Sequence, residues 1–73
     1  MLRSVKFKAG KPLEHKQVIA AIADGQAQLG QGGRLVVRAS GTEPVIRVMG
    51  EADDATLVSS VVAQIEAAIL NVA

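Results

Sequence analysis

The sequence predicts an α+β fold in which two helices pack on one face of a small antiparallel sheet. Three observations favour this class: two apolar segments have helical spacing, three shorter segments have the character of strands, and glycine or proline interrupts the chain between several of them. The predicted order is strand, helix, strand, strand, helix. All 73 residues are expected to form one small domain with a modest core.

The first strand is predicted at residues 3–8. Arg3, Val5 and Phe7 alternate with polar residues there, so these three side chains share one face. The segment "AGKP" ends this pattern, and Pro12 suits the first turn of a helix because its ring fixes φ near the helical value.

Residues 13–29 carry the helical period and predict the first helix. Gly25 weakens it by about 1 kcal/mol relative to alanine. Gly30 suits the position just after its end. The apolar face is expected to be formed by Val18, Ile19, Ile22 and Leu29.

Residues 34–39 and 45–51 predict the second and third strands. Only residues 40–44 separate them, so the two strands should be antiparallel neighbours. Asp53 and Asp54 are typical N-cap residues for a second helix over residues 55–70. Its wide apolar stripe should pack against the sheet and consists of Leu57, Val58, Val61, Val62, Ile65 and Ile69.

Composition excludes several function classes. The chain has 8 basic and 7 acidic residues and a single aromatic residue, Phe7, so it lacks the basic stripe and stacking platform of a nucleic-acid binder. It has no cysteine, which rules out disulfides and thiol chemistry within it. It has neither an uninterrupted apolar run of about 18 residues nor a signal-peptide core. We therefore expect a cytoplasmic protein without nucleic-acid or membrane partners.

Four polar or glycine-rich features are better explained by structure than by chemistry. Residues 30–33 follow a helix and open a strand, which is the reverse of a dinucleotide-binding loop. His15 stands alone near a helix start, without the partners of a metal site. Ser40 lacks the first glycine of a nucleophile elbow, since Arg38 occupies that position. Asp53 and Asp54 are typical of helix caps rather than of a catalytic pair. We expect neither catalytic nor metal-binding residues in this chain.

The segment "RASGTEPVIRVM", residues 38–49, is typical of an anion-binding loop. Arg38 can bind a phosphate through two parallel hydrogen bonds, and Ser40 and Thr42 each offer a hydroxyl donor. In a short hairpin, Arg47 should return close to Arg38. These four side chains could therefore surround one phosphate or carboxylate.

Three further residues complete this loop. Gly41 can bring its backbone close to the anion and can adopt a positive φ, so that successive N–H groups form a nest. Pro44 stiffens the turn. Glu43 only accepts hydrogen bonds, so it could order an arginine through a salt bridge or reach a hydroxyl or amine of a ligand. The alternative is a plain hairpin with solvated arginines, since these are common turn residues.

The same loop closely resembles the phosphate-binding loop of the α-D-phosphohexomutases, in the form "R-x-S-G-T-E-P-x-x-R-V-M-x-E" that is found in bacterial phosphoglucosamine mutases. Every defined position of this pattern matches between Arg38 and Glu51. The upstream "PLEH", residues 12–15, and the strand–helix order are also similar to the C-terminal, fourth domain of that family. The resemblance covers essentially the whole chain.

The resemblance implies a function that the chain would share with other domains. The family interconverts glucosamine 6-phosphate and glucosamine 1-phosphate through a 1,6-bisphosphate, on the route to UDP-N-acetylglucosamine and peptidoglycan precursors. Its phosphoserine and its Mg²⁺ ligands lie in domains whose motifs this chain lacks. The fourth domain binds the phosphate that is not reacting, a role that would fall to Arg38, Ser40, Gly41 and Thr42. Arg47 would contact or support it.

The chain is then expected to be an excised domain, residues 1–73, that is not catalytic alone. Its partners would be the phosphorylated hexosamine and the other mutase domains. Rival readings are a phosphomannomutase or phosphoglucomutase of the same superfamily, a ligand-sensing module, an oligomerisation domain, or a nucleic-acid module of split α+β type.

Overall fold

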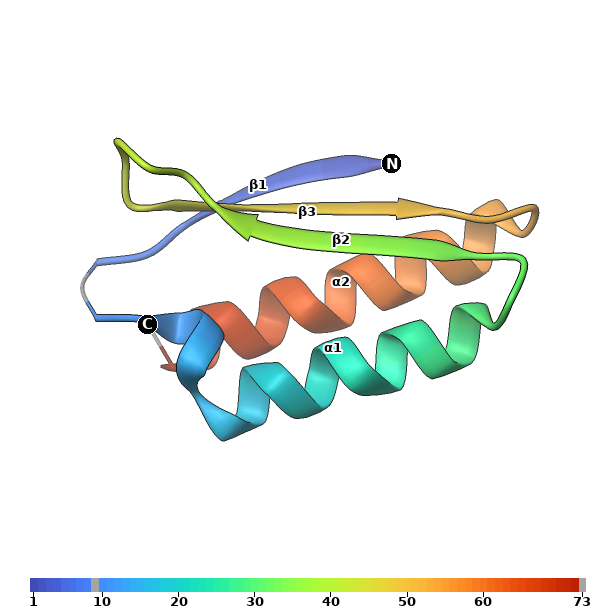
Figure 1. Cartoon of the computed structure of the whole chain (residues 1–73), viewed down its shortest axis with the longest axis horizontal. Coiled ribbons are helices and arrows are strands. Elements are labelled where there is room, and N and C mark those ends of the chain that lie inside the picture. The colour runs from blue at the N-terminus through green and yellow to red at the C-terminus, as the bar shows by residue number, and fades with distance from the viewer. Residues whose placement is uncertain (9, 73) are drawn as a thin grey trace.

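A computed structural model of the chain describes residues 1–8 and 10–72. In chain order the elements are β1 (Leu2–Lys6), a 3₁₀ turn η1 (Pro12–Glu14), α1 (Lys16–Leu29), β2 (Arg34–Ala39), β3 (Val45–Glu51) and α2 (Ala55–Val72). The strands form one layer, and both helices lie on the same side of it (Figure 1). The α+β class and the strand–helix–strand–strand–helix order are therefore confirmed.

The three strands form one antiparallel sheet in the order β1-β3-β2. The predicted pairing of the second strand with the third is thus confirmed. The central strand is β3, because β1 pairs with its other edge, and this arrangement is not evident from the sequence. Over most of the length of β3, each residue consequently has a cross-strand neighbour in β1 and another in β2.

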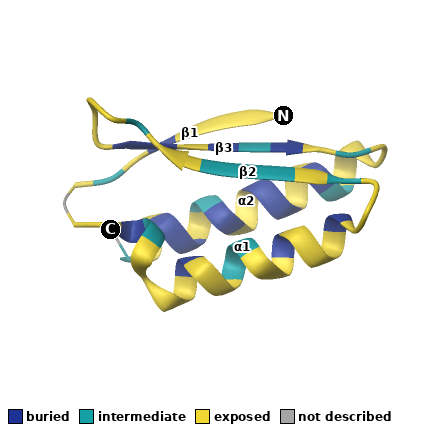
Figure 2. Ribbon diagram, viewed as in Figure 1, coloured by how far each residue is buried: buried dark blue, intermediate teal, exposed yellow. Residues whose placement is uncertain are grey.

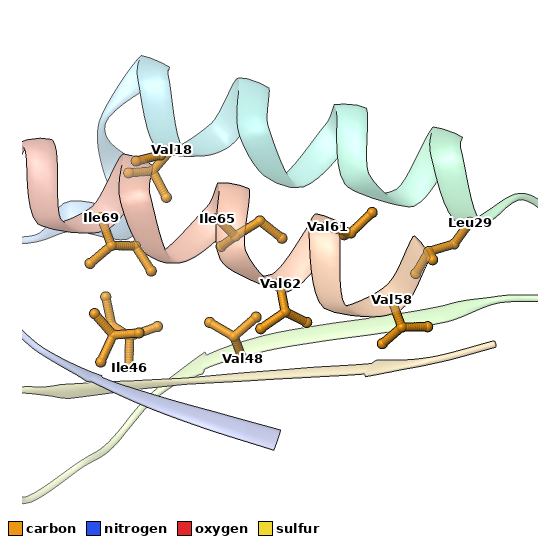
Figure 3. Packing of buried hydrophobic residues seen from close by; sticks show 11 residues of the cluster. Val18, Leu29, Ile46, Val48, Val58, Val61, Val62, Ile65 and Ile69 are labelled. Atoms are coloured by element: carbon orange, nitrogen blue, oxygen red, sulfur yellow. The ribbon is translucent and has the colours of Figure 1, made fainter. Parts of the chain in front are cut away.

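The core fills the space between the sheet and the helices (Figures 2 and 3). Ile46 and Val48 of β3 point from the sheet toward α2, as Figure 3 shows. Full burial of one such side chain contributes about 1.5–3 kcal/mol. The fully buried side chains that form the centre of the core are Val5, Val18, Ile46, Val48, Val61, Val62, Ile65 and Ile69.

The first helix begins later than predicted, at Lys16 rather than at residue 13. The proline starts the separate 3₁₀ turn η1, and His15 then becomes the N-cap of α1. Its Nδ1 atom accepts a hydrogen bond from the backbone N–H of Gln17 at 3.1 Å. The expectation of an exposed histidine at the helix start is confirmed, and capping gives it a structural role.

The predicted buried face of α1 is wrong at one position. Ile19 is 53% exposed, whereas Val18 and Leu29 are buried. The face that meets α2 also includes Gly25, where an added methyl group would lie 2.7 Å from Cγ1 of Val61. Glycine therefore allows a close approach of the two helices, which offsets its low helix propensity.

The second helix begins after Asp54, whose Oδ1 accepts the backbone N–H of Leu57 at 3.1 Å. The predicted cap is thus made by this residue, and the helix continues two residues beyond the predicted end at residue 70. By length and composition, α2 could cross a membrane. In this domain, however, its apolar stripe is buried against the sheet and α1.

Candidate functional site on the open face of the sheet

The face of the sheet that points away from the helices carries two cross-strand rows of side chains. In the first row, Ser4 of β1, Arg47 of β3 and Arg38 of β2 are aligned. The next row contains Leu2, Met49 and Val36 from the same three strands. The polar row and the apolar row are therefore adjacent on this face. Neither helix covers the face (Figure 1).

The two arginines of the first row, Arg38 and Arg47, are register partners. The Cα atoms of such partners lie about 4.5–5.5 Å apart, which confirms that Arg47 returns close to Arg38. Both residues are exposed. Over residues 1–8 and 10–72, the ion pairs are Arg3–Glu66 and Lys11–Glu14, so neither of these arginines is neutralised. Like charges at opposed positions destabilise a sheet, and a bound anion would relieve that repulsion.

The loop between β2 and β3 bends away from the helices, toward the open face (Figure 1). Its base is held by a hydrogen bond from the N–H of Ser40 to the carbonyl of Val45, at 2.8 Å. The carbonyl of Pro44 accepts the N–H of Phe7 at 3.0 Å, which ties the loop to the segment after β1. These bonds fix both ends of the loop beside the arginine row.

The hydroxyl of Ser40 is oriented by its own loop. Its Oγ accepts the backbone N–H of Thr42 at 3.4 Å. A hydroxyl that accepts one hydrogen bond still has its own hydrogen to donate. The Ser40 hydroxyl can therefore donate to an anion while its oxygen accepts the N–H of Thr42.

Gly41 does not adopt the positive φ that glycine permits. Among the described residues, glycines with left-handed backbone occur at Gly10 and Gly30 but not at Gly41. The loop closes without that conformation, and the Ser40 hydroxyl accepts the N–H of Thr42 across Gly41. No atom lies within 4 Å of the place where a side chain of Gly41 would begin, so glycine leaves open space at this point of the loop.

A hollow of about 410 Å³ lies where the arginines, the loop and the apolar row meet. Four residues predicted from the loop motif line it: Arg38, Ser40, Gly41 and Arg47. Sequence reasoning missed the apolar part of its lining, which is Leu2, Val36, Ala39 and Met49. Strand alternation could have found two of them, since Val36 and Met49 lie two residues from Arg38 and Arg47 and hence on the same face.

The other three residues of the predicted set lie outside this lining. Thr42, Glu43 and Pro44 are exposed on the raised loop. The suggested salt bridge from Glu43 to an arginine is not formed, since the ion pairs over the described residues do not include it. The lining contains no histidine or carboxylate, so Ser40 has no general base within the hollow. Two guanidinium groups and one hydroxyl are the polar side chains of this lining, and they suit an anion better than acid–base chemistry.

A metal ion does not fit the side chains that the structure describes. Over residues 1–8 and 10–72, no three histidine, aspartate or glutamate side chains gather closely enough to hold one. The two arginines would also repel a cation from the hollow.

The sequence of this chain matches a known family and several curated proteins. Residues 3–68 match the family model described as "Phosphoglucomutase/phosphomannomutase, C-terminal domain". Among curated proteins, the chain is 56% identical over 69 residues to the phosphoglucosamine mutase of Parvibaculum lavamentivorans, which covers 94% of this chain. It is 63% identical over 62 residues, or 85% of the chain, to that of Sphingopyxis alaskensis.

The matched relatives are much longer proteins. The chain spans 15% of the length of the Parvibaculum protein and 14% of that of the Sphingopyxis protein. The family match, by contrast, extends from the first strand almost to the end of α2 and includes the whole arginine-bearing hairpin. The chain therefore belongs to the family of phosphoglucomutase/phosphomannomutase C-terminal domains.

Proposed function

We propose that this chain is the domain of a phosphoglucosamine mutase that binds the substrate phosphate which is not reacting. The observation that carries the proposal is the opposed, unneutralised pair Arg38 and Arg47 beside a hydroxyl-bearing loop. The names of the curated relatives support glucosamine as the sugar of the substrate, since the Parvibaculum and Sphingopyxis proteins are phosphoglucosamine mutases.

In this proposal each loop residue has a separate role. Arg38 and Arg47 supply charge and paired N–H donors, and the Ser40 hydroxyl donates from the edge of the hollow. The Thr42 hydroxyl donates once the loop closes on the ligand. Gly41 lets the phosphate approach the backbone, because no side chain occupies that space. Pro44 supports the loop through its fixed φ and its hydrogen bond from Phe7.

The parent enzyme would interconvert glucosamine 6-phosphate and glucosamine 1-phosphate in the cytoplasm, with glucosamine 1,6-bisphosphate as the intermediate. The serine that carries the phosphoryl group and the ligands of the Mg²⁺ ion would lie in its other domains. The arginines and hydroxyls would contact only the phosphate, so they could hold the substrate by either end, which suits a reaction whose intermediate must reverse. Closure of this domain over the others would position the reacting end and exclude water.

A glucose or mannose phosphate is the second candidate substrate. The matched family model favours it, because its description names phosphoglucomutase and phosphomannomutase. The individual relatives favour the amino sugar, since those of Parvibaculum, Sphingopyxis and Caulobacter vibrioides are all phosphoglucosamine mutases. Activity of the longer parent protein on the three sugar phosphates would decide between them.

Binding to the 73-residue chain is the direct test of the phosphate site. Three or four charge-assisted contacts of about 1.5–3 kcal/mol each are opposed by an association cost of about 4–15 kcal/mol. We therefore expect inorganic phosphate or glucosamine 6-phosphate to bind at about millimolar concentration or more weakly. In an NMR titration, the amide signals of residues 38–47 should shift with added ligand.

Two substitutions and one control locate the binding. Arg38→Gln or Arg47→Gln should reduce the affinity about tenfold or more, because each removes one charge-assisted contact. Arg34→Gln is the matched control, since Arg34 lies on the same face at the far end of β2, opposite Glu51. Shifts confined to another surface, or micromolar affinity that survives both substitutions, would overturn the proposal.

A further inference from the structure

Glu43 is the only acidic residue between Arg38 and Met49, and it lies beside an anion site that it should disfavour. We propose that its carboxylate binds the ammonium group of an amino sugar whose phosphate is attached to the neighbouring carbon, C1. The loop would then distinguish glucosamine 1-phosphate from sugar phosphates without that amine. This inference rests on the proposed phosphate site and adds a specificity-determining residue to it.

Glu43 belongs to the same loop as two residues that line the hollow, Ser40 and Gly41, but is not itself part of the lining. It lies on the loop that bends toward the open face (Figure 1), two residues after Gly41, which lines the hollow. Its own carbonyl accepts the N–H of Val45 at 2.8 Å, and the next residue is tied to Phe7. The backbone is therefore held at the carbonyl of Glu43 and at the residue after it, while the side chain of Glu43 is exposed.

The carboxylate has no cation of its own over the described parts of the chain. The ion pairs there join Arg3 with Glu66 and Lys11 with Glu14. Two uncompensated arginines thus lie in adjacent strands, and an uncompensated carboxylate lies on the loop that joins those strands. A ligand that carries a phosphate and an ammonium close together would match both charges.

The chemistry of the two amino sugar phosphates makes this match selective. The amine of glucosamine is on C2, directly next to C1, while C6 lies outside the ring on its other side. When the phosphate on the arginines belongs to C1, the ammonium lies within reach of a group beside the phosphate. When it belongs to C6, the ammonium points toward the other end of the ligand. Glu43 would therefore contact glucosamine 1-phosphate but not glucosamine 6-phosphate.

The effect should be small and should depend on charge. An exposed ion pair contributes about 0.2–1 kcal/mol, so the 73-residue chain should bind glucosamine 1-phosphate up to about fivefold more tightly than glucose 1-phosphate. N-acetylglucosamine 1-phosphate, whose C2 substituent is neutral, should behave as glucose 1-phosphate does or bind more weakly. Added salt should reduce the preference.

The experiment compares these ligands on the wild-type chain and on Glu43→Gln by NMR titration, at a slightly acidic pH where the amine is protonated. The substitution should abolish the preference for the amine. It should also strengthen binding of glucose 1-phosphate slightly, because a negative charge near the phosphate has been removed. Glu51→Gln is the matched control: it removes an exposed carboxylate from the far end of β3 and should leave the preference intact.

Three outcomes separate this inference from the phosphate site itself. A preference for glucosamine 1-phosphate that disappears only in Glu43→Gln supports the inference. Equal dissociation constants for glucose 1-phosphate and glucosamine 1-phosphate, both measured from the shifts of residues 38–47, would overturn the role of Glu43. The phosphate site would still be supported. Absence of any shift in residues 38–47 with every sugar phosphate would overturn both.

Discussion

The two faces of the sheet differ in what their side chains do, and β3 contributes to both. On the helix side, Ile46 and Val48 are fully buried and hold the layers together. On the open side, Arg47 and Met49 contact the hollow instead. Because side chains alternate along a strand, four consecutive residues contribute in turn to the core and to the candidate site. One strand thus contributes to stability and, under the proposed function, to ligand binding.

The arginines sharpen this contrast. Arg3 shares the helix-facing side of β1 with Val5, and its guanidinium binds the carboxylate of Glu66 in α2 at 2.9 Å. Arg38 and Arg47 on the open side are opposed to each other and belong to neither ion pair of the described residues. The helix-facing arginine therefore joins two layers, while the open face keeps positive charge available to a ligand at some expense of stability.

The largest effect should separate the two faces of β3. Ile46→Ala removes a fully buried side chain and should lower the free energy of unfolding by about 2–5 kcal/mol. Met49→Ala, on the open side of the same strand, should lower it by about 1 kcal/mol or less. Denaturant unfolding monitored by circular dichroism measures both. Similar losses for the two variants would mean that the open face is also part of the core.

The next largest effect compares two glycines. Gly25→Ala places a methyl group 2.7 Å from Cγ1 of Val61 and should destabilise the chain by about 1–3 kcal/mol, although alanine favours helix. Gly41→Ala meets no atom within 4 Å and should leave the unfolding midpoint nearly unchanged. A stabilised Gly25→Ala variant would contradict the close contact between α1 and α2.

The smallest effects should have opposite signs on the two faces. Arg3→Gln breaks an ion pair that is partly exposed to solvent and should lower the stability by about 0.2–1 kcal/mol. Arg47→Gln removes a like-charge contact and should raise it by a similar amount in a buffer without multivalent anions. Differential scanning calorimetry can resolve both shifts. Changes of the same sign in both variants would contradict the idea that Arg3 stabilises the fold while Arg47 destabilises it.

Much of the fold could be predicted because the spacing of apolar residues along the sequence indicates which side chains are buried. The strands at 34–39 and 45–51 are confirmed at their predicted bounds, since apolar β-branched residues concentrate there. Periodicity alone fails at Ile19, which is apolar but lies next to the buried face of α1 and is exposed. Which apolar residues of α1 are buried depends on where α2 packs, and the sequence of α1 does not contain that information. The role of Gly25 was missed for the same reason.

The candidate site was predicted in part. The loop motif identified Arg38 and Arg47, and the hairpin places them opposite each other as expected. The conformation of Gly41 and the apolar lining were not foreseen. Within the loop, the Ser40 hydroxyl accepts the N–H of Thr42, a short-range contact that the sequence motif alone does not announce. Leu2 joins the apolar lining because β1 pairs with the far edge of β3, and that long-range pairing is not specified by local sequence.

The most direct test of a phosphate-binding open face is the stability of wild-type chain and Arg38→Gln in chloride and in phosphate at equal ionic strength. In chloride, the variant should be as stable as wild type or up to about 1 kcal/mol more stable. Phosphate at about ten times its dissociation constant for wild type should stabilise wild type by about 1.4 kcal/mol and a variant with tenfold weaker binding by about 0.4 kcal/mol. The difference in stability should therefore shift by about 1 kcal/mol in favour of wild type when phosphate replaces chloride. Equal stabilisation of both proteins by phosphate would contradict the account.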